Sequence, residues 1–414
     1  MAKSPKQETK KEAASLKEKN SSQDIPTMNV GIFGHIDHGK TTLLSRLTGV
    51  WASRHSEELK RGITIKLGYA DIIISKEGET YNREGKGKAV SHISFVDSPG
   101  HEMLMSTMLS GVAMIDTAIL VVAANEGIKP QTREHLIALH AKNIKNVIVV
   151  QNKIDLIPRE KTKQNYQEIL ALLKGKYDSA PIIPVSAQQE VNINKIYRAL
   201  AELPLPSRDA SGTPLFLVAR SFDINRPGTR PADLHGAVLG GTLKKGTLRI
   251  GDEIEIKPGR VIKEANQYHY KTVTTKVVRL FNGSNEVQAL TPGGSMSIET
   301  ELDMVLGKND ALAGCVASLA KTLPEIALNL KVHFRLFSES FTSSGTVKIE
   351  PLKPSETIML NVNTSKTLAM IKKIHGNEAE LILKTPLVPF KGDNVAISRN
   401  FNTHWRLIGS GEIV

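Results

Sequence analysis

The run Gly34-His35-Ile36-Asp37-His38-Gly39-Lys40-Thr41-Thr42 follows the apolar segment Met28 to Phe33 and decides the fold of the first part of the chain. A glycine, four residues, a second glycine, a lysine and a threonine predict a strand, a loop and a helix whose backbone N–H groups converge on phosphate. Lys40 would place its ammonium group between two phosphates of a nucleotide, and the hydroxyl of Thr41 would bind a bridging magnesium ion. An ordinary glycine-containing turn between a strand and a helix is the alternative, because the pattern alone can arise by chance.

The composition of the chain bounds the class of protein. Its 414 residues, 40% of them hydrophobic, suffice for two to four domains of about 150 residues each, and we expect three. The sequence has no apolar run of about 18 residues and no apolar segment behind the N-terminal lysines, so we expect a cytoplasmic protein without a membrane partner. The single Cys315 cannot form an internal disulfide bond, which agrees with a reducing compartment.

The charge of the chain is strongly basic. A net charge of +12 favours a polyanionic partner, although basic side chains that only solvate the surface are the alternative. Residues 1–27 carry six lysines, with Leu16 and Ile25 as the only large aliphatic residues. Such a segment cannot offset the entropy of ordering by burial, so we expect a disordered basic arm that is solvated or contacts RNA weakly.

Short β-rich runs alternate with helical patterns between residues 28 and 207, which predicts a mostly parallel sheet wrapped by helices. The runs are Val30 to Gly34, Ile93 to Asp97, Ala118 to Ala124, Val147 to Gln151 and Ile182 to Val185. Helical spacing relates Leu104, Met108 and Val112, and also Leu136 and Leu139. Ligands of such sheets bind beyond the carboxyl ends of the strands, where the candidate residues below also lie.

Asp97-Ser98-Pro99-Gly100 follows the second run. Asp97 could hold magnesium through a water molecule, and the N–H group of Gly100 could meet the γ-phosphate of a nucleotide. A pattern this short carries weight only together with the others.

Asn152-Lys153-Ile154-Asp155 follows the fourth run and predicts a pocket for guanine. The carboxylate of Asp155 can accept hydrogen bonds from N1–H and the N2 amine of guanine, whereas adenine offers neither donor. Asn152 would brace the base, and the stem of Lys153 would lie along its face. After the fifth run, Ser186-Ala187, with Gln188 next to them, are suited to present a backbone N–H group to guanine O6.

A polar loop, Glu57 to Lys66, lies between the first two motifs and contains Thr64 as a candidate switch residue. Its hydroxyl and carbonyl groups could bind magnesium and the γ-phosphate only in the triphosphate state, so that loss of the phosphate releases the loop. A threonine in a loop is usually structural, and Thr64 is a candidate only because of its place in the series. Four motifs in this order leave little room for chance.

At this point the chain resembles the translational GTPases, the family of elongation factor Tu, through the phosphate loop, Arg61-Gly62-Ile63-Thr64-Ile65 and Asp97-Ser98-Pro99-Gly100-His101. A closer resemblance is to the gamma subunits of archaeal and eukaryotic translation initiation factor 2. It is carried by the segments from Ser56 to Ala70, from Arg220 to Gly228 and from Trp405 to Gly409, and it covers residues 29–414.

The resemblance implies a GTPase that binds GTP or GDP together with Mg²⁺. It implies that His101 positions the hydrolytic water, with Asp37 beside it in the catalytic set. The residues implied near the metal are Asp37, Thr41, Gly62, Thr64 and Asp97. Those implied at the nucleotide are Asp37, His38, Gly39, Lys40, Thr41, Thr42 and Gly100 on the phosphate side, and the guanine residues named above.

One segment departs from the family pattern. Most archaeal gamma subunits insert a zinc knuckle with two pairs of cysteines before the Asp97 motif, but the corresponding residues, Ser75 to Ser91, contain no cysteine. Thiolate ligands are what such a structural site requires, so no zinc is expected here.

Helical periodicity disappears after the linker of Pro204 to Thr213, and two β-rich blocks follow, residues 208–327 and 328–414. Hairpin-like patterns surround Gly240-Gly241, Lys244-Lys245-Gly246 and Pro292-Gly293-Gly294. Ile254 and Ile256 alternate with charged residues, as do Val332, Phe334 and Leu336. Many short strands without helices predict two small closed β-barrels, which the resemblance also implies.

The expected function is that of a GTP-dependent carrier of methionyl initiator tRNA. It would work with alpha and beta subunits, as one part of a heterotrimer, on the small ribosomal subunit. An elongation-type carrier, such as the selenocysteine-specific factor, is one alternative, from which a fourth domain would be expected. A nucleotide-gated scaffold that binds protein partners is the other.

Overall fold

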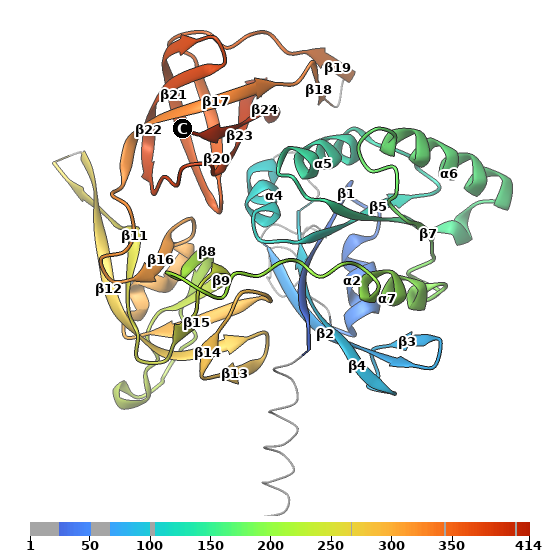
Figure 1. Ribbon diagram of the computed structural model, residues 1–414, viewed down its shortest axis with the longest axis horizontal. Helices are drawn as coiled ribbons and strands as arrows, with labels where there is room; N and C mark the ends of the chain where they lie inside the picture. Colours follow the sequence, from blue (N-terminus) through green and yellow to red (C-terminus); the bar gives the residue numbers. More distant parts are fainter. Residues whose placement is uncertain (1–24, 51–66, 100–103, 266, 343–344, 402–403) are drawn as a thin grey trace, which may run out of the picture.

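An α/β domain and two β-barrels make up the computed structural model (Figure 1). It describes residues 25–50, 67–99, 104–265, 267–342, 345–401 and 404–414. Most of the predicted N-terminal arm lies outside these ranges, and so do Gly62, Thr64, Gly100 and His101. No helix within the described ranges is long and apolar enough to span a bilayer.

The first domain is built on a seven-stranded sheet with the order β3-β2-β4-β1-β5-β6-β7. Strands β4, β1, β5, β6 and β7 are parallel, which confirms the predicted mostly parallel sheet, while β2 and β3 add an antiparallel edge. The strands are β1 (Thr27–Gly34), β2 (Gly68–Glu77), β3 (Thr80–Asn82), β4 (Lys88–Asp97), β5 (Thr117–Ala123), β6 (Asn146–Asn152) and β7 (Ile182–Pro184).

Helices cover both faces of this sheet and enclose two apolar cores. Leu44 of α2 and Ile196 of α7 pack in one core, and Met108 of α4 and Leu139 of α5 pack in the other. The predicted helical spacing is confirmed in α4 and α5. The helices are α2 (Lys40–Thr48), α4 (Met105–Val112), α5 (Pro130–Ala141), α6 (Arg159–Leu173) and α7 (Ile193–Ala201), with a 3₁₀ turn η2 (Ile154–Leu156).

The end of β2, all of β3 and the start of β4 form the cysteine-free segment of residues 75–91. Tyr81 of β3 is 9% exposed, and its ring packs into the core shared by α2 and α7. Its hydroxyl donates a hydrogen bond to Oε1 of Glu202 at 3.4 Å, and the ammonium group of Lys76 lies 5.3 Å from the ring centroid. A buried aromatic ring and strand pairing therefore hold this hairpin.

The first barrel closes through a pairing of β11 with β12. The ring order is β11-β16-β8-β9-β15-β12, and β13 pairs outside it with β12. Its elements are β8 (Leu215–Phe222), η3 (Pro231–Asp233), β9 (Val238–Lys245), β10 (Leu248–Arg249), β11 (Glu253–Glu264), β12 (Gln267–Asn282), β13 (Asn285–Val287), β14 (Ala289–Leu290), β15 (Met296–Thr300), η4 (Met304–Asp310) and β16 (Val316–Leu319).

The predicted turn at Gly240-Gly241 is wrong, because both glycines lie inside β9. They pair with β8 where the register between the two strands shifts. A Cβ atom on Gly241 would lie 1.9 Å from the carbonyl oxygen of Leu217, so the glycine serves close approach of two backbones rather than a turn. The other two predicted turns do fall between strands, at Gly246 and at Pro292 to Gly294.

The second barrel is a closed ring in the order β17-β22-β21-β20-β23-β24. Val332 and Phe334 of β17 are buried and alternate with exposed neighbours, as the sequence predicts. The two closed barrels confirm the predicted fold class. The strands are β17 (Ala327–Leu336), β18 (Glu339–Thr342), β19 (Gly345–Lys348), β20 (Thr357–Val362), β21 (Ser365–His375), β22 (Glu378–Leu387), β23 (Asn394–Phe401) and β24 (His404–Ile413).

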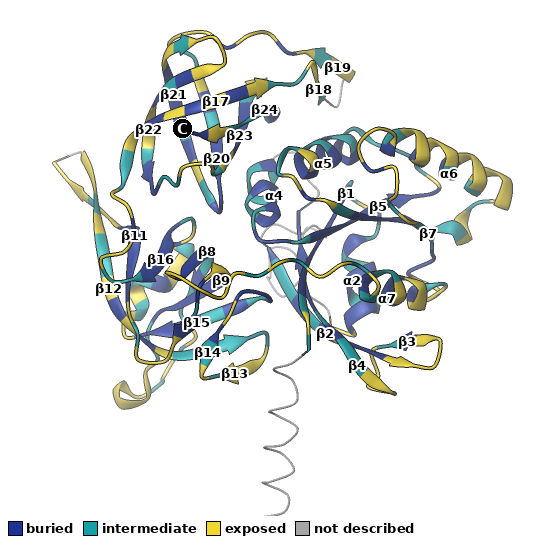
Figure 2. Ribbon diagram, viewed as in Figure 1, coloured by how far each residue is buried: buried dark blue, intermediate teal, exposed yellow. Residues whose placement is uncertain are grey.

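A buried ion pair fastens the second barrel to the first domain. Nη1 of Arg406, on β24, lies 3.1 Å from Oε2 and 3.2 Å from Oε1 of Glu134, on α5. Both side chains are 3% exposed. Figure 2 shows that β1 and β5 are buried along their length, whereas α6 faces solvent on one side.

We predict that Arg406→Met lowers the free energy of unfolding by about 3–5 kcal/mol, because it removes the countercharge of a buried carboxylate. Chemical denaturation followed by circular dichroism measures the change. Arg230→Met is the matched control, since Arg230 pairs with Asp233 at 84% and 53% exposure. Loss of this exposed ion pair should lower the free energy of unfolding by less than about 1 kcal/mol. Equal losses in the two variants would contradict the role of the buried pair.

Candidate nucleotide site

The loop between β1 and α2 has the backbone geometry that close phosphate approach requires. Asp37 has a φ of 60°, and Gly39, the N-cap of α2, has a φ of 88°. A Cβ atom on Gly39 would lie 2.5 Å from Nδ2 of Asn152. Glycine is therefore needed at this position for its left-handed conformation and also for space.

Lys40 and the first turn of α2 form the basic side of the site. No side chain caps the helix, so the N–H groups of its first turn face the loop. Lys40 is 7% exposed, and its Nζ donates a hydrogen bond to the carbonyl oxygen of His35 at 2.7 Å. Burial lowers the pKa of Lys40 to about 8, against the attraction of Asp97 and Asp37. Thr42 lies in the same turn and is half-buried.

Thr41 and Asp97 meet where the metal was predicted. The hydroxyl of Thr41 donates a hydrogen bond to Oδ2 of Asp97 at 3.2 Å, because β1 and β4 are adjacent and parallel. Hydroxyl and carboxylate oxygens are the donors that Mg²⁺ prefers. The described residues contain no cluster of three or more His, Cys, Asp or Glu side chains. A magnesium ion shared with phosphates needs only one or two protein oxygens, so this pair fits it.

The amide of Asn152 joins three loops on the guanine side. Its Nδ2 donates to the carbonyl oxygen of His38 at 3.0 Å, and its Oδ1 accepts from the N–H group of Ala187 at 3.0 Å. Lys153 has a φ of 61°, and its Nζ lies 3.3 Å from Oε1 of Glu126. The structure thus brings the phosphate loop beside the ends of β6 and β7.

The remaining guanine residues follow the same two strands. Asp155 lies in η2 and is exposed, Ser186 is buried, and Gln188 is exposed. The structure does not describe Gly62, Thr64, Gly100 or His101, so their predicted roles lie outside what its geometry addresses.

Two buried histidines form hydrogen bonds that anchor the phosphate loop to its surroundings. The N–H group of Gly34 donates to Nδ1 of His135 at 2.9 Å, and Nδ1 of His38 donates to the carbonyl oxygen of Val121 at 3.2 Å. Burial lowers the pKa of each imidazole to about 3, so both rings are neutral at pH 7. Sequence analysis missed His135, because a single histidine at a helical position carries no signal of its contact with a distant loop.

Comparison with known proteins supports the assignment of this site to a guanine nucleotide. The family model for the elongation factor Tu GTP-binding domain matches residues 25–205, and the model for the C-terminal part of initiation factor eIF2 gamma matches residues 328–413. Translation initiation factor 2 subunit gamma of Methanococcus maripaludis is 46% identical over 402 residues, which are 94% of this chain and 98% of the relative. That of Archaeoglobus fulgidus is 45% identical over 94% of this chain and 95% of the relative.

The chain belongs to the family of translation initiation factor 2 gamma subunits. It is therefore a translational GTPase of protein synthesis that binds guanine nucleotides.

Solved structures of elongation factors share the fold. A bacterial selenocysteine-specific elongation factor matches with a TM-score of 0.73 at 23% identity, over 94% of this chain and 58% of that one. Elongation factor SelB of Methanococcus maripaludis, in complex with a GTP analogue, matches with a TM-score of 0.71 at 24% identity over 94% of this chain and 79% of that one. At this sequence identity the similarity shows only that the fold is shared. The assignment to a family rests on the gamma-subunit relatives.

We predict that Gly39→Ala weakens GDP binding by more than about tenfold, a loss of about 1.4 kcal/mol, because the new methyl group displaces Asn152 and distorts the loop. Titration with a fluorescent GDP measures the dissociation constant. Gly251→Ala is the matched control, since Gly251 has the same φ of +88° and no atom within 4 Å of the place that a methyl group would take. Unchanged GDP binding in Gly39→Ala would contradict the assigned geometry.

Proposed function

We propose that this gamma subunit carries methionyl initiator tRNA to the small ribosomal subunit in a GTP-dependent manner, in a cytoplasmic heterotrimer with alpha and beta subunits. The full-length match to gamma subunits, at 46% identity over 94% of the chain, is the observation that carries the proposal. The assembled phosphate loop and guanine loops support the nucleotide dependence.

The chemistry at the site follows from its residues. Mg²⁺, when bound, neutralises charge on the phosphates. Lys40 would hold phosphate oxygens, Thr41 and Asp97 would hold the metal, with Asp37 near them, and Asp155 would select guanine. From the family resemblance, His101 positions the water that attacks the γ-phosphate, while Thr64, Gly62 and Gly100 respond to the presence of that phosphate.

One contact would transmit the difference between the GTP and GDP states from the predicted switch loop to the first barrel. Nη1 of Arg220, on β8, donates to the carbonyl oxygen of Leu67 at 3.2 Å, and Leu67 directly follows the predicted switch loop. Nε of the same guanidinium lies 2.7 Å from Oδ1 of Asp310. A shift of the loop end would therefore act on a half-buried ion pair in the barrel, which supports a tRNA-binding surface that depends on the nucleotide.

We predict that Asp155→Asn reverses the base preference from guanine to xanthine by at least about tenfold, a change of about 1.4 kcal/mol. The amide can donate to the oxygen at position 2 of xanthine, whereas the carboxylate accepts from the amine of guanine. Competition between GDP and xanthosine diphosphate measures the preference. Gln188→Ala, at another exposed position of the predicted guanine site, should change both affinities alike. A variant with full guanine preference would show that the base lies elsewhere.

We predict that methionyl initiator tRNA binds more tightly with a GTP analogue than with GDP, by about 5- to 150-fold, a usual coupling between two sites. Binding is measured at physiological salt with the alpha subunit present. Deacylated initiator tRNA is the control and should bind weakly in both states. Equal affinities throughout, falling steeply with salt, would leave only non-specific attraction and would favour a nucleotide-gated scaffold.

A further inference from the structure

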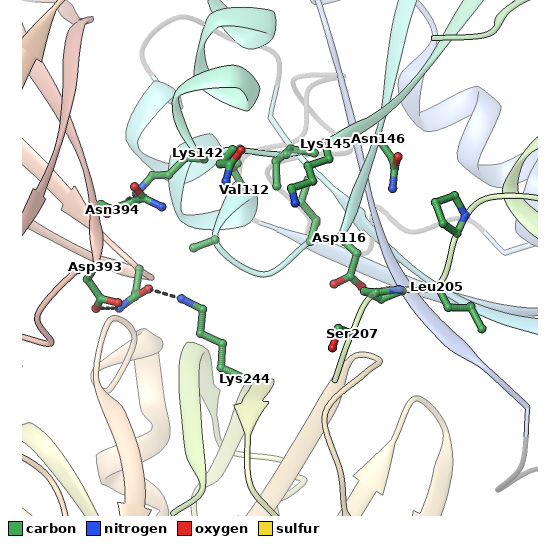
Figure 3. A pocket seen from close by; sticks show the side chains of 18 residues that line it. Val112, Asp116, Lys142, Lys145, Asn146, Leu205, Ser207, Lys244, Asp393 and Asn394 are labelled. Atoms are coloured by element: carbon green, nitrogen blue, oxygen red, sulfur yellow. Dashed lines mark hydrogen bonds between the residues drawn. The ribbon is translucent and has the colours of Figure 1, made fainter. Parts of the chain in front are cut away.

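A cavity of about 590 Å³ lies where the three domains meet (Figure 3). Asp116 and Asn146, at the starts of β5 and β6, line it on the first domain. Those are the amino ends of the strands, whereas the nucleotide site lies at their carboxyl ends. The cavity is therefore separate from the nucleotide site, and its volume is in the range of small-molecule sites.

Three lysines face this cavity from two domains. Lys142 and Lys145 come from the connection between α5 and β6, and Lys244 comes from β9 of the first barrel. Figure 3 shows Lys244 extending toward Asp393 of the second barrel.

The described residues do not use all the hydrogen-bond donors of these ammonium groups. Nζ of Lys142 donates to the carbonyl oxygens of Asn361 at 3.3 Å and Asn394 at 2.9 Å, and Nζ of Lys244 donates to Oδ1 of Asn363 at 3.1 Å. Lys145 makes no hydrogen bond or ion pair with any residue that the structure describes. Since an ammonium group has three donors, each lysine keeps at least one for a ligand.

The two carboxylates at the cavity are already engaged by other groups. Oδ2 of Asp116 accepts from Nη2 of Arg208 at 2.6 Å and from the N–H group of Asn29 at 2.8 Å. Oδ2 of Asp393 accepts from Nδ2 of Asn363 at 2.5 Å. Arg208 offsets the charge of Asp116, whereas the neutral amide of Asn363 leaves the charge of Asp393 in place. One carboxylate therefore faces three lysines, and their positive charge is compensated only in part.

The pKa of Lys142 agrees with this excess of positive charge. Burial, and to a smaller extent the nearby Lys244, lower the pKa of Lys142 to about 8, and only Asp393 acts in the opposite direction. An anion placed between the lysines would relieve this repulsion.

We propose that this cavity binds a small free phosphate anion with two or more charges, of the pyrophosphate class. Residues of both barrels and of the linker at Pro204 and Pro206 line the cavity together with the first domain. Such an ion would contact the first domain and the first barrel at once, next to the second barrel, and would hold the three in one arrangement. The inference is independent of the proposed tRNA function.

Calorimetric titration with inorganic pyrophosphate tests the site. The full chain is first saturated with GDP and Mg²⁺, and free Mg²⁺ is held constant, so that the phosphate loop is occupied by nucleotide. The variants are Lys145→Gln, Lys145→Arg and the control Lys163→Gln, whose lysine is exposed on α6. A single-stranded RNA oligonucleotide, titrated separately, tests a polymer as the source of phosphate.

Pyrophosphate should bind the unaltered chain and the Lys163→Gln variant equally. Lys145→Gln should weaken it about fivefold or more through loss of a charge-assisted contact, and Lys145→Arg should retain most of the affinity. GDP affinity should be the same in all variants. No binding of pyrophosphate, or equal binding in Lys145→Gln, would overturn the proposal. RNA binding that depends on Lys145, without pyrophosphate binding, would overturn it in favour of a polymer.

Discussion

The side-chain amide of Asn152 is the contact on which the nucleotide site depends. One amide group satisfies a backbone acceptor in the phosphate loop and a backbone donor after β7, at 3.0 Å each. Asn152 is 2% exposed, so loss of either bond would leave a buried polar group without a partner. The parallel order of β1, β5, β6 and β7 places these loops at one edge, and the amide then sets their spacing.

Buried polar contacts also set the place of the first barrel. Asn29 of β1 accepts from the N–H group of Gly294 at 2.6 Å and donates to the carbonyl oxygen of Met114 at 2.8 Å. Asn29 lies toward the start of the same strand that leads into the phosphate loop. The end of this one strand therefore leads into the nucleotide site, and a residue near its beginning makes the contact with the barrel.

Local patterns predicted much of this molecule, because their physical basis is local. Alternation in Val332 and Phe334 identified a half-buried strand, and the spacing around Gly39 and Lys40 identified the loop and the helix. The turn predicted at Gly240-Gly241 is wrong because a sequence cannot distinguish a glycine that turns from one that lets two backbones approach. His135 was missed because its contact with Gly34 joins residues 101 positions apart. The partner of Glu134 on β24 could not be predicted either, because that contact also joins residues far apart in the sequence.

Two consecutive residues of helix α5 contact different parts of the molecule. The ring of His135 holds the N–H group of Gly34 beneath the phosphate loop, and Glu134 holds Arg406 of the last barrel. Successive side chains of a helix point about 100° apart, and the helix is stiff over such a distance. A displacement of the last barrel that moves Glu134 would therefore also move the ring that contacts the start of the phosphate loop, which gives this helix a mechanical link between the two.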